Sequence, residues 1–235
     1  MSAHNTINLT ISLELSQKAN SKQQTANIMN RNNNRSNGKA GQGKSGLIRI
    51  IAGQWRGRKL PVHDIEGLRP TTDRVKETVF NWLMPYINNQ TRCLDCFAGS
   101  GSLAFEALSR GAKSVMLIEK DKTAANQISQ NLKLLAVDNA QLINADSLDV
   151  ITKLNVITKL NEPQQFDLVF IDPPFRKNLA GPICHLLEGK QLLSPSALIY
   201  VEVESELNDR SMPDSWQLVK QKVAGQVSYS LYQRS

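Results

Sequence analysis

The sequence lacks the features that mark exported and membrane-spanning proteins. Its 235 residues include only three cysteines, and an odd number argues against the disulfide framework of a secreted domain. It has no run of 18 apolar residues and no charged-then-apolar segment at its start, so we expect neither a membrane span nor an export signal. A chain of this length can bury a core without disulfide bonds. These absences predict a cytoplasmic protein.

Acidic residues are also scarce in one part of the chain, its first 46 residues. That segment has one acid and six bases and carries +5 of the net charge of +7. Residues 47–76 carry +4 from seven bases and three acids, whereas residues 77–235 carry −2. A basic segment at one end of a slightly acidic body predicts a polyanionic partner such as a nucleic acid. A solvated charged face without a partner is the alternative.

Residues 1–46 are predicted to form a disordered, basic, polar tail. Asn, Ser, Gln and Gly dominate residues 20–46, so there is too little apolar surface to offset the entropy of ordering. Residues 38–45 match the phosphate-binding pattern G-x4-G-K-S. That pattern needs a buried strand before it and a helix after it, but an asparagine run precedes it and a strand-like segment follows. We therefore expect no nucleoside triphosphate site in the tail.

From residue 47 onward the pattern predicts regular structure. Residues 47–52 and 58–62 are expected to form a hairpin, followed by a helix over 73–83 that Asp73 caps and Pro85 ends. Apolar strands then alternate with helices that have apolar residues in phase. The predicted strands are 93–97, 115–118, 140–144, 166–171 and 197–203, and the helices are 102–109, 122–135, 147 onward and 179–187.

This alternation predicts an α/β fold with a mostly parallel, Rossmann-like sheet covered by helices on both faces. The last two strands, 216–223 and 226–232, have no helix between them, so we expect an antiparallel hairpin at the C-terminal edge. The early hairpin and helix form a small N-terminal extension of this sheet.

A glycine-rich segment follows the first predicted parallel strand. Gly99 and Gly101 permit a tight turn, and Glu119 ends the next strand, where a carboxylate can accept hydrogen bonds from both ribose hydroxyls. Asp95, just before the glycines, would repel a pyrophosphate but suits an ammonium group. S-adenosylmethionine carries an ammonium, a sulfonium and an adenosine, so it fits this segment better than a dinucleotide does.

Two further positions bear on this cofactor. Asp146 follows the third parallel strand, where it can accept from the adenine amino group, with Ser147 beside it. A plain helix N-cap is an equally good interpretation of Asp146.

Cys93 and Cys96 form a C-x-x-C pair, but no second Cys or His pair completes four ligands, so we expect small buried residues and no metal site.

The residues Asp172-Pro173-Pro174-Phe175 come directly after the strand 166–171. The two prolines keep the turn extended and leave the carbonyl of Pro173 without a helix partner. That carbonyl and the Asp172 carboxylate can hold the two N–H bonds of a planar NH2 group and turn its lone pair toward a methyl donor. Phe175 can stack on the attached base, a contact of ~1–3 kcal/mol. A proline turn with a buried Phe is the bland alternative.

Several segments, in order, resemble the RsmD family of class I S-adenosylmethionine-dependent methyltransferases. They are residues 69–74 (RPTTDR), 94–101 (LDCFAGSG), 172–175 (DPPF) and 223–227 (VAGQV). The resemblance covers residues 47–235, and the tail and a doubled VITKLN hexapeptide from Val150 depart from it. It implies methylation of N2 of guanine 966 in 16S ribosomal RNA, within the assembled 30S subunit. It also implies an RNA-gripping hairpin and helix in 47–84 and a methyltransferase domain in 85–235.

The resemblance implies a role for each matched position. The cofactor residues would be Asp95, Phe97, Gly99, Ser100, Gly101, Glu119, Asp146 and Ser147. The RNA-binding residues would be Arg49, Arg56, Arg58, Lys59, Arg69 and Arg74, and residues 172–175 would hold the guanine. Direct in-line transfer by a monomer is expected, with no histidine base, because His63 and His185 lie outside the motifs.

Three alternatives share part of this pattern. A DNA adenine-N6 or a protein glutamine methyltransferase would share the DPPF segment but not RPTTDR or VAGQV. A nicotinamide-dependent dehydrogenase would share only the glycine loop. A non-catalytic RNA-binding module would keep only the basic hairpin.

Overall fold

The computed structural model describes residues 46–62, 72–154, 165–206 and 212–235. Residues 1–45 of the predicted tail, with its phosphate-loop-like segment, lie outside these residues, as do His63, Arg69 and the whole second VITKLN copy at 156–161. Expectations for those positions therefore stay predictions.

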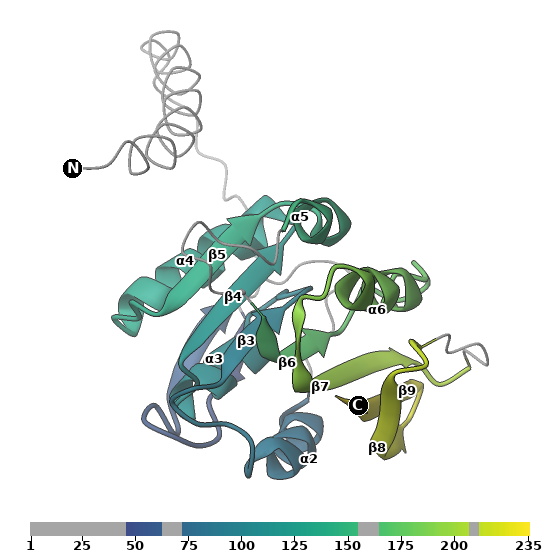
Figure 1. Ribbon diagram of the computed structural model, residues 1–235. Coiled ribbons are helices and arrows are strands. Elements are labelled where there is room, and N and C mark those ends of the chain that lie inside the picture. The colour runs from purple at the N-terminus through teal and green to yellow at the C-terminus, as the bar shows by residue number, and fades with distance from the viewer. Residues whose placement is uncertain (1–45, 63–71, 155–164, 207–211) are drawn as a thin grey trace, which may run out of the picture. The chain divides into compact units, whose positions relative to one another are not determined.

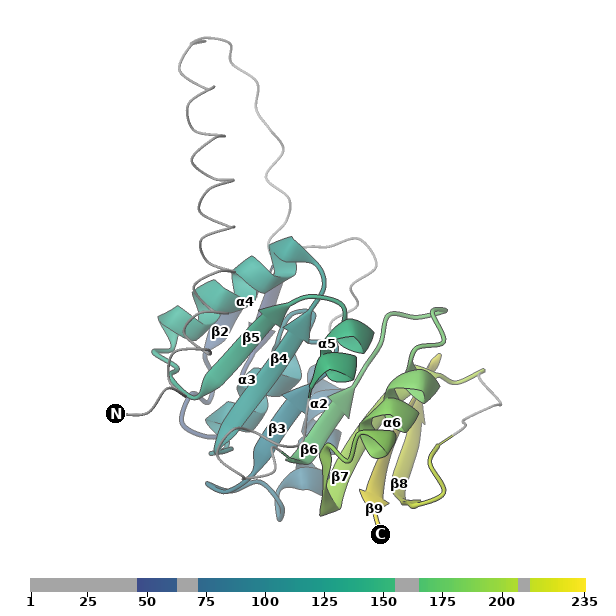
Figure 2. The same ribbon diagram turned by 45° about the horizontal axis from the view of Figure 1, so that its top comes forward.

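A mixed sheet in the strand order β5-β4-β3-β6-β7-β9-β8 forms the centre of the described structure (Figure 1). Figure 2 shows these strands running from β5 at one edge to β8 at the other. Strands β3 to β7 pair in parallel, and β9 is antiparallel to both β7 and β8. The strands are β3 Arg92–Asp95, β4 Ser114–Glu119, β5 Ala140–Asn144, β6 Phe166–Ile171, β7 Leu193–Glu204, β8 Trp216–Ala224 and β9 Val227–Arg234. This topology confirms the predicted fold class.

Helices cover both faces of the sheet. They are α2 Asp73–Leu83, α3 Ser102–Ser109, α4 Lys122–Leu134, α5 Ser147–Lys153 and α6 Ala180–Gly189. Helices α2, α3 and α4 pack on one face, in a core that includes Phe80, Phe105 and Phe170. Helices α5 and α6 pack on the other face through Ile151 and Ile183. Successive strand residues alternate between these two cores, as the pleat of a strand requires.

The N-terminal hairpin is fixed to helix α3. It consists of β1 Gly46–Arg49 and β2 Lys59–Val62. Buried Glu106 of α3 accepts hydrogen bonds from the backbone N–H groups of Ile51 (2.7 Å) and Ala52 (3.0 Å). The predicted strand 47–52 therefore ends early, at Arg49, because these amides bond to a side chain of α3 instead of the ladder.

The start of helix α2 differs from the prediction by one residue. Thr72, not Asp73, is the N-cap, and its hydroxyl accepts from Val75 N at 3.3 Å. Asp73 is the first helical residue, where its charge favours the helix N-terminus, and it lies 3.7 Å from the ammonium of Lys76. Lys76 is buried and donates to the backbone oxygen of Arg49 (2.5 Å) and to Ser102 Oγ (3.1 Å). Lys76 therefore links β1, α2 and the first turn of α3.

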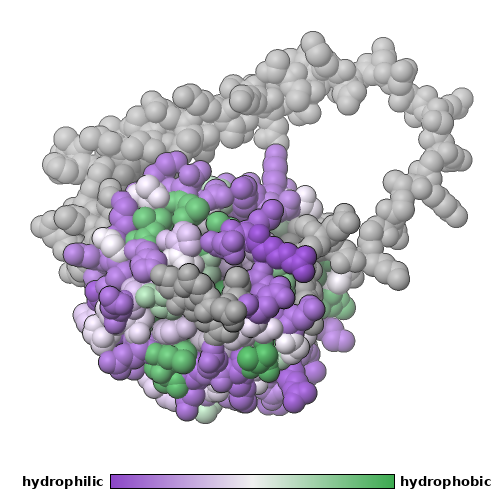
Figure 3. Space-filling view, turned by 90° about the vertical axis from the view of Figure 1, so that its right-hand side faces the viewer, coloured by the Kyte–Doolittle hydropathy of each residue, from purple (hydrophilic) through white to green (hydrophobic). Residues whose placement is uncertain are grey.

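The side of the molecule that includes the β8 edge is mostly hydrophilic, with separate apolar patches (Figure 3). Leu218, Val219 and Val223 of β8 are exposed on this edge strand. Within the described ranges, no helix combines the length and the apolar character needed to cross a bilayer.

Candidate active site

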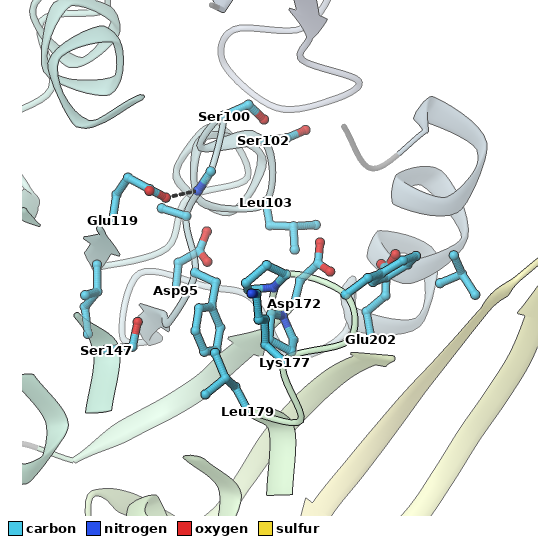
Figure 4. A pocket seen from close by; sticks show the side chains of 18 of the residues that line it. Asp95, Ser100, Ser102, Leu103, Glu119, Ser147, Asp172, Lys177, Leu179 and Glu202 are labelled. Atoms are coloured by element: carbon cyan, nitrogen blue, oxygen red, sulfur yellow. Dashed lines mark hydrogen bonds between the residues drawn. The ribbon is translucent and has the colours of Figure 1, made fainter. Parts of the chain in front are cut away.

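A cavity of about 820 Å³ lies at the carboxyl ends of the parallel strands (Figure 4). Ligands of open α/β sheets bind at this edge, because the strand ends and the helix N-termini meet there. All but one of the residues predicted to bind cofactor or guanine line the cavity; these are Asp95, Phe97, Gly99, Ser100, Glu119, Asp146, Ser147, Asp172, Pro173, Pro174 and Phe175. The exception is Gly101, which is absent from the lining.

Gly101 shapes the loop instead of lining the cavity. Its φ is +76°, a left-handed conformation that strains other residues, and an added Cβ would lie 2.6 Å from the ring of Phe105. Its carbonyl accepts from Phe105 N at 2.9 Å, so Gly101 turns the chain into α3. Gly99 donates its N–H to Glu119 Oε2 at 2.6 Å, which links the loop to the end of β4.

Asp95 is a buried carboxylate with unmet hydrogen-bonding capacity. Among the described residues, its Oδ1 is a buried side-chain oxygen without a hydrogen-bond partner. Burial, with a smaller contribution from the charge of Glu119, raises the pKa of Asp95 to about 7, against the lowering effect of hydrogen bonds from the backbone of Phe97 and Ala104. A cation in the cavity would supply the missing partner, so the ammonium of S-adenosylmethionine fits this position.

Glu119 ends β4 beside the same loop. Its side chain is mostly buried, and it accepts from Gly99 N and from Asp121 N, the second at 2.7 Å. Burial raises the pKa of Glu119 above its ordinary value, which those amide hydrogen bonds partly offset. A carboxylate held in this way at the cavity wall has the chemistry to accept hydroxyl donors such as those of a ribose.

Asp146 is a helix N-cap, as one interpretation of its sequence predicts, and it also lies at the cavity. It is the N-cap of α5, with Oδ1 accepting from Leu148 N at 2.9 Å, and it also lines the cavity. Its Oδ2 lies 3.1 Å from Lys120 Nζ, and this hydrogen bond lowers the pKa of Asp146. Ser147 is buried and donates its hydroxyl to the carbonyl of Cys96. Asp146 therefore caps helix α5 and at the same time lies at the cavity.

Residues 172–175 follow β6 and line the cavity, and Figure 4 shows Asp172 on the other side of the Asp95 side chain from Glu119. Pro173 is buried and Pro174 is exposed. The turn continues with Arg176 at φ +61°, whose N–H donates to Glu204 Oε1. The segment thus leaves the sheet as an extended turn instead of a helix, as the two prolines predict.

The predicted RNA-binding side chains are exposed wherever the structure describes them. They are Arg49, Arg56, Arg58, Lys59 and Arg74. Arg49 and Lys59 are register partners on the hairpin. Arg74 lies in the first turn of α2, between Thr72 and Val75, which both line the cavity. Arg74 is therefore an exposed base that lies, along the chain, between two cavity-lining residues.

Several cavity residues were missed by sequence reasoning. They include Thr72, Val75, Lys120, Lys177, Leu179, Glu202, Ala224, Gly225 and Val227. Thr72 and the β8–β9 turn belong to the RPTTDR and VAGQV segments, which carried the resemblance but no assigned cavity role. Glu202 had no local signal, since it is the one charged residue in the mainly apolar stretch 197–203.

The C-x-x-C pair is part of the core. Cys93 and Cys96 are free and buried, and burial raises the pKa of both thiols. In the part of the chain that the structure describes, no group of three or more His, Cys, Asp or Glu side chains could hold a metal ion.

Comparisons with known proteins identify the family of this chain. A family model described as Conserved hypothetical protein 95 matches residues 48–233. Ribosomal RNA small subunit methyltransferase D of Haemophilus influenzae is 56% identical over 190 residues, covering 80% of this chain and 94% of that protein. The Escherichia coli protein of the same name is 50% identical, covering 81% and 91%. The solved structure of yhhF from Escherichia coli has a TM-score of 0.73 at 49% identity, covering 81% and 99%. The chain therefore belongs to the RsmD family of class I S-adenosylmethionine-dependent methyltransferases.

Proposed function

We propose that this protein methylates the exocyclic N2 of guanine 966 in 16S ribosomal RNA, in the assembled 30S subunit, and that it acts as a monomer. The names of the relatives at 56% and 50% identity support a ribosomal RNA methyltransferase. The observation that carries the finer proposal is the convergence of Asp95 and Glu119 with residues 172–175 on one cavity. Family membership speaks against the nicotinamide-dependent dehydrogenase.

The acidic end of the cavity would hold the cofactor. Asp95 would pair with the ammonium group, Glu119 would accept from the ribose hydroxyls, and Asp146 would accept from the adenine amino group. Phe97 and the Gly99 loop would form the wall along the ligand. When bound, S-adenosylmethionine supplies an electrophilic methyl group, and its transfer to N2 yields S-adenosylhomocysteine, N2-methylguanine and a proton.

Residues 172–175 would hold the guanine. The carboxylate of Asp172 and the carbonyl of Pro173 would each accept one N2–H bond, which turns the nitrogen lone pair toward the methyl donor. Phe175 would stack on the base, and stacking of this kind contributes ~1–3 kcal/mol. Asp172 orients the amine, and the proton leaves after the transfer, so no histidine base is required.

The basic hairpin and α2, residues 47–84, would bind RNA phosphates, while residues 85–235 carry out the transfer. The support is the exposure of the described basic side chains and the position of Arg74 between two cavity-lining residues. Since Glu106 fixes the loop after β1 to the glycine-loop helix, RNA bound on the hairpin would have a constant position relative to the cofactor end.

The test compares Asp172→Ala with a control in the preceding strand β6, Asp167→Asn. Asp167 pairs with Arg92 and is absent from the cavity lining. With labelled S-adenosylmethionine and undermethylated 30S subunits, wild type and Asp167→Asn should label a guanine N2. Asp172→Ala should lose the transfer while it still binds S-adenosylhomocysteine in calorimetry. Activity retained by Asp172→Ala would contradict the assignment.

The same assay separates the remaining alternatives. Label on adenine N6 or on a protein glutamine would identify one of the other amino-group methyltransferases. RNA binding without any transfer by the wild type would indicate a non-catalytic module. Naked 16S RNA labelled as well as 30S subunits would overturn the assembled-particle part of the proposal.

A further inference from the structure

Two carboxylates from neighbouring strands face the guanine end of the cavity. The register of β6 and β7 pairs Ile171 with Val201, so the next positions along each strand are Asp172 and Glu202. Adjacent strands lie ~4.8 Å apart, which brings these two residues close together. Both line the cavity, and Figure 4 shows Glu202 beyond Asp172 on the side away from Glu119. The function proposed above gives a role to Asp172 but none to Glu202.

Glu202 is held in place by its neighbour on β7. The hydroxyl of Tyr200 donates to Glu202 Oε2 at 2.6 Å. Tyr200 is fully buried, and its ring contacts the ring of Phe170 in an edge-on arrangement at 6.3 Å between centroids. Glu202 is itself only 7% exposed. The hydrogen bond from Tyr200 fixes the direction of the carboxylate. Because one carboxylate can accept several hydrogen bonds, Glu202 can also accept from a ligand in the cavity.

Guanine is the base whose edge matches two adjacent carboxylates. Its N1–H and N2–H2 groups are neighbouring donors on the Watson–Crick edge, which an extruded base presents to its enzyme. Adenine and cytosine carry an unprotonated ring nitrogen beside the amino group, and that lone pair would face a carboxylate. A site built on buried acceptors rejects such a base because its acceptors are left without partners.

We propose that Glu202 determines base specificity by accepting the N1–H of the target guanine, while Asp172 accepts from N2, and that Tyr200 is the residue that positions Glu202. This inference rests on the proposed function, since it presumes that guanine N2 is the acceptor. It assigns a recognition role to a residue that does not contact the transferred methyl group.

The test uses RNA in which 2-aminopurine replaces the target guanine. This base keeps the 2-amino group but has an unprotonated N1. Wild type should prefer guanine by at least ~100-fold in kcat/KM. In Glu202→Gln the amide can donate to N1, so the guanine to 2-aminopurine ratio should fall by at least ~10-fold. Tyr200→Phe keeps the carboxylate without its anchor and should lower the ratio less.

Binding and folding measurements complete the test. The fluorescence of 2-aminopurine RNA reports binding to each variant apart from turnover, and it should show tighter binding to Glu202→Gln than to wild type. Glu188→Gln, which loses a carboxylate that pairs with Arg234 away from the cavity, is the control and should keep the wild-type ratio. If the variants do not fold, wild type alone decides, with 1-methylguanine RNA expected to be inactive as well.

The outcomes separate this inference from the proposed function. Wild type that does not methylate guanine N2 overturns the proposed function. Wild type that methylates guanine and 2-aminopurine equally overturns only the specificity role of Glu202. A parallel fall of both rates in Glu202→Gln, with an unchanged ratio, would mean that the Tyr200–Glu202 bond is structural and would also overturn it.

Discussion

The backbone N–H of Gly99 donates a 2.6 Å hydrogen bond to the carboxylate of Glu119. This contact joins the loop after β3 to the end of β4, two elements 20 residues apart in the chain. It fixes the glycine loop against a carboxylate that also lines the cavity. Glu119 therefore has two tasks, and a substitution can separate them.

Glu119→Gln should weaken cofactor binding while the fold is kept. The glutamine oxygen can still accept from Gly99, but its NH2 group cannot accept from Asp121 N, and the charge that strengthens hydrogen bonds from the ribose is lost. A charge-assisted hydrogen bond contributes ~1.5–3 kcal/mol, so the Kd for S-adenosylhomocysteine should rise by roughly 10- to 100-fold in calorimetry. The control is Asp121→Asn, at the N-cap of α4, which is absent from the cavity lining. Equal affinity of Glu119→Gln and wild type would rule out the ribose contact.

Asp95 should make stability depend on pH. The pKa of Asp95 rises from 3.8 to about 7 in the folded protein, mainly through burial. Between these two pH values the carboxyl group is protonated in the folded state and ionised in the unfolded state. The unfolding free energy should therefore fall as pH rises from about 4 to about 7, by up to about 4 kcal/mol. Asp95→Asn removes this dependence and should be the more stable protein above pH 7. Urea titrations at several pH values measure it, and parallel curves for both proteins would contradict the prediction.

Cofactor binding should also depend on pH through Asp95. An ammonium group favours the ionised carboxylate, so binding near pH 6 should release a proton and affinity should increase as pH rises through about 7. Calorimetry with S-adenosylhomocysteine in two buffers of different ionisation enthalpy counts the proton. Asp95→Asn should bind more weakly and lose the proton release. Undiminished proton release in that variant would assign the effect to another group.

Two glycines of the hairpin loop test how the hairpin is attached. Gly53 and Gly57 both have positive φ, but an added Cβ at Gly53 would lie 1.8 Å from the carbonyl oxygen of Ser109, whereas at Gly57 it meets nothing within 4 Å. Gly57→Ala should cost about 1–2 kcal/mol, from backbone strain alone. Gly53→Ala should cost more, because the loop must also move away from α3. Equal losses of unfolding free energy would mean that the loop moves freely.

The basic hairpin should contribute an electrostatic part of RNA affinity. Replacing exposed Arg56 and Arg58 with alanine should weaken RNA binding and reduce the slope of log K against log salt by roughly one per residue. Lys153→Ala removes an exposed charge from α5, which packs on the other face of the sheet, and should leave that slope unchanged. Filter binding at several salt concentrations measures both. An equal loss of slope per removed charge in Lys153→Ala would indicate non-specific attraction and would contradict a specific role of the hairpin.

Much of the fold and of the candidate site could be predicted from the sequence, because local residue preferences determine them. Strands and helices alternate with clear breaks at glycine and proline, so the parallel sheet and its antiparallel edge were predicted correctly. Asp95, Glu119, Asp146 and Asp172 each follow or end a strand, and the carboxyl ends of parallel strands share one edge. Their common cavity follows from that rule. The errors were local, such as the N-cap of α2, where two adjacent residues both suit the position.

Pairings between distant segments were decided only by the tertiary structure. The sequence gives no sign that Glu106 is more than an ordinary helix residue. Its carboxylate nevertheless accepts hydrogen bonds from the backbone N–H groups of Ile51 and Ala52, more than 50 residues earlier. Glu202 lies in a mainly apolar stretch of sequence that gives no sign of a role at the site. Only the register of β6 with β7 brings it beside Asp172. The sequence by itself determined which segments become strands and helices, and which strands have polar residues at their carboxyl ends. These features depend on residue preferences that act over only a few positions. Register and helix docking depend on side chains that meet only after folding, so the tertiary structure decided which polar groups share the cavity.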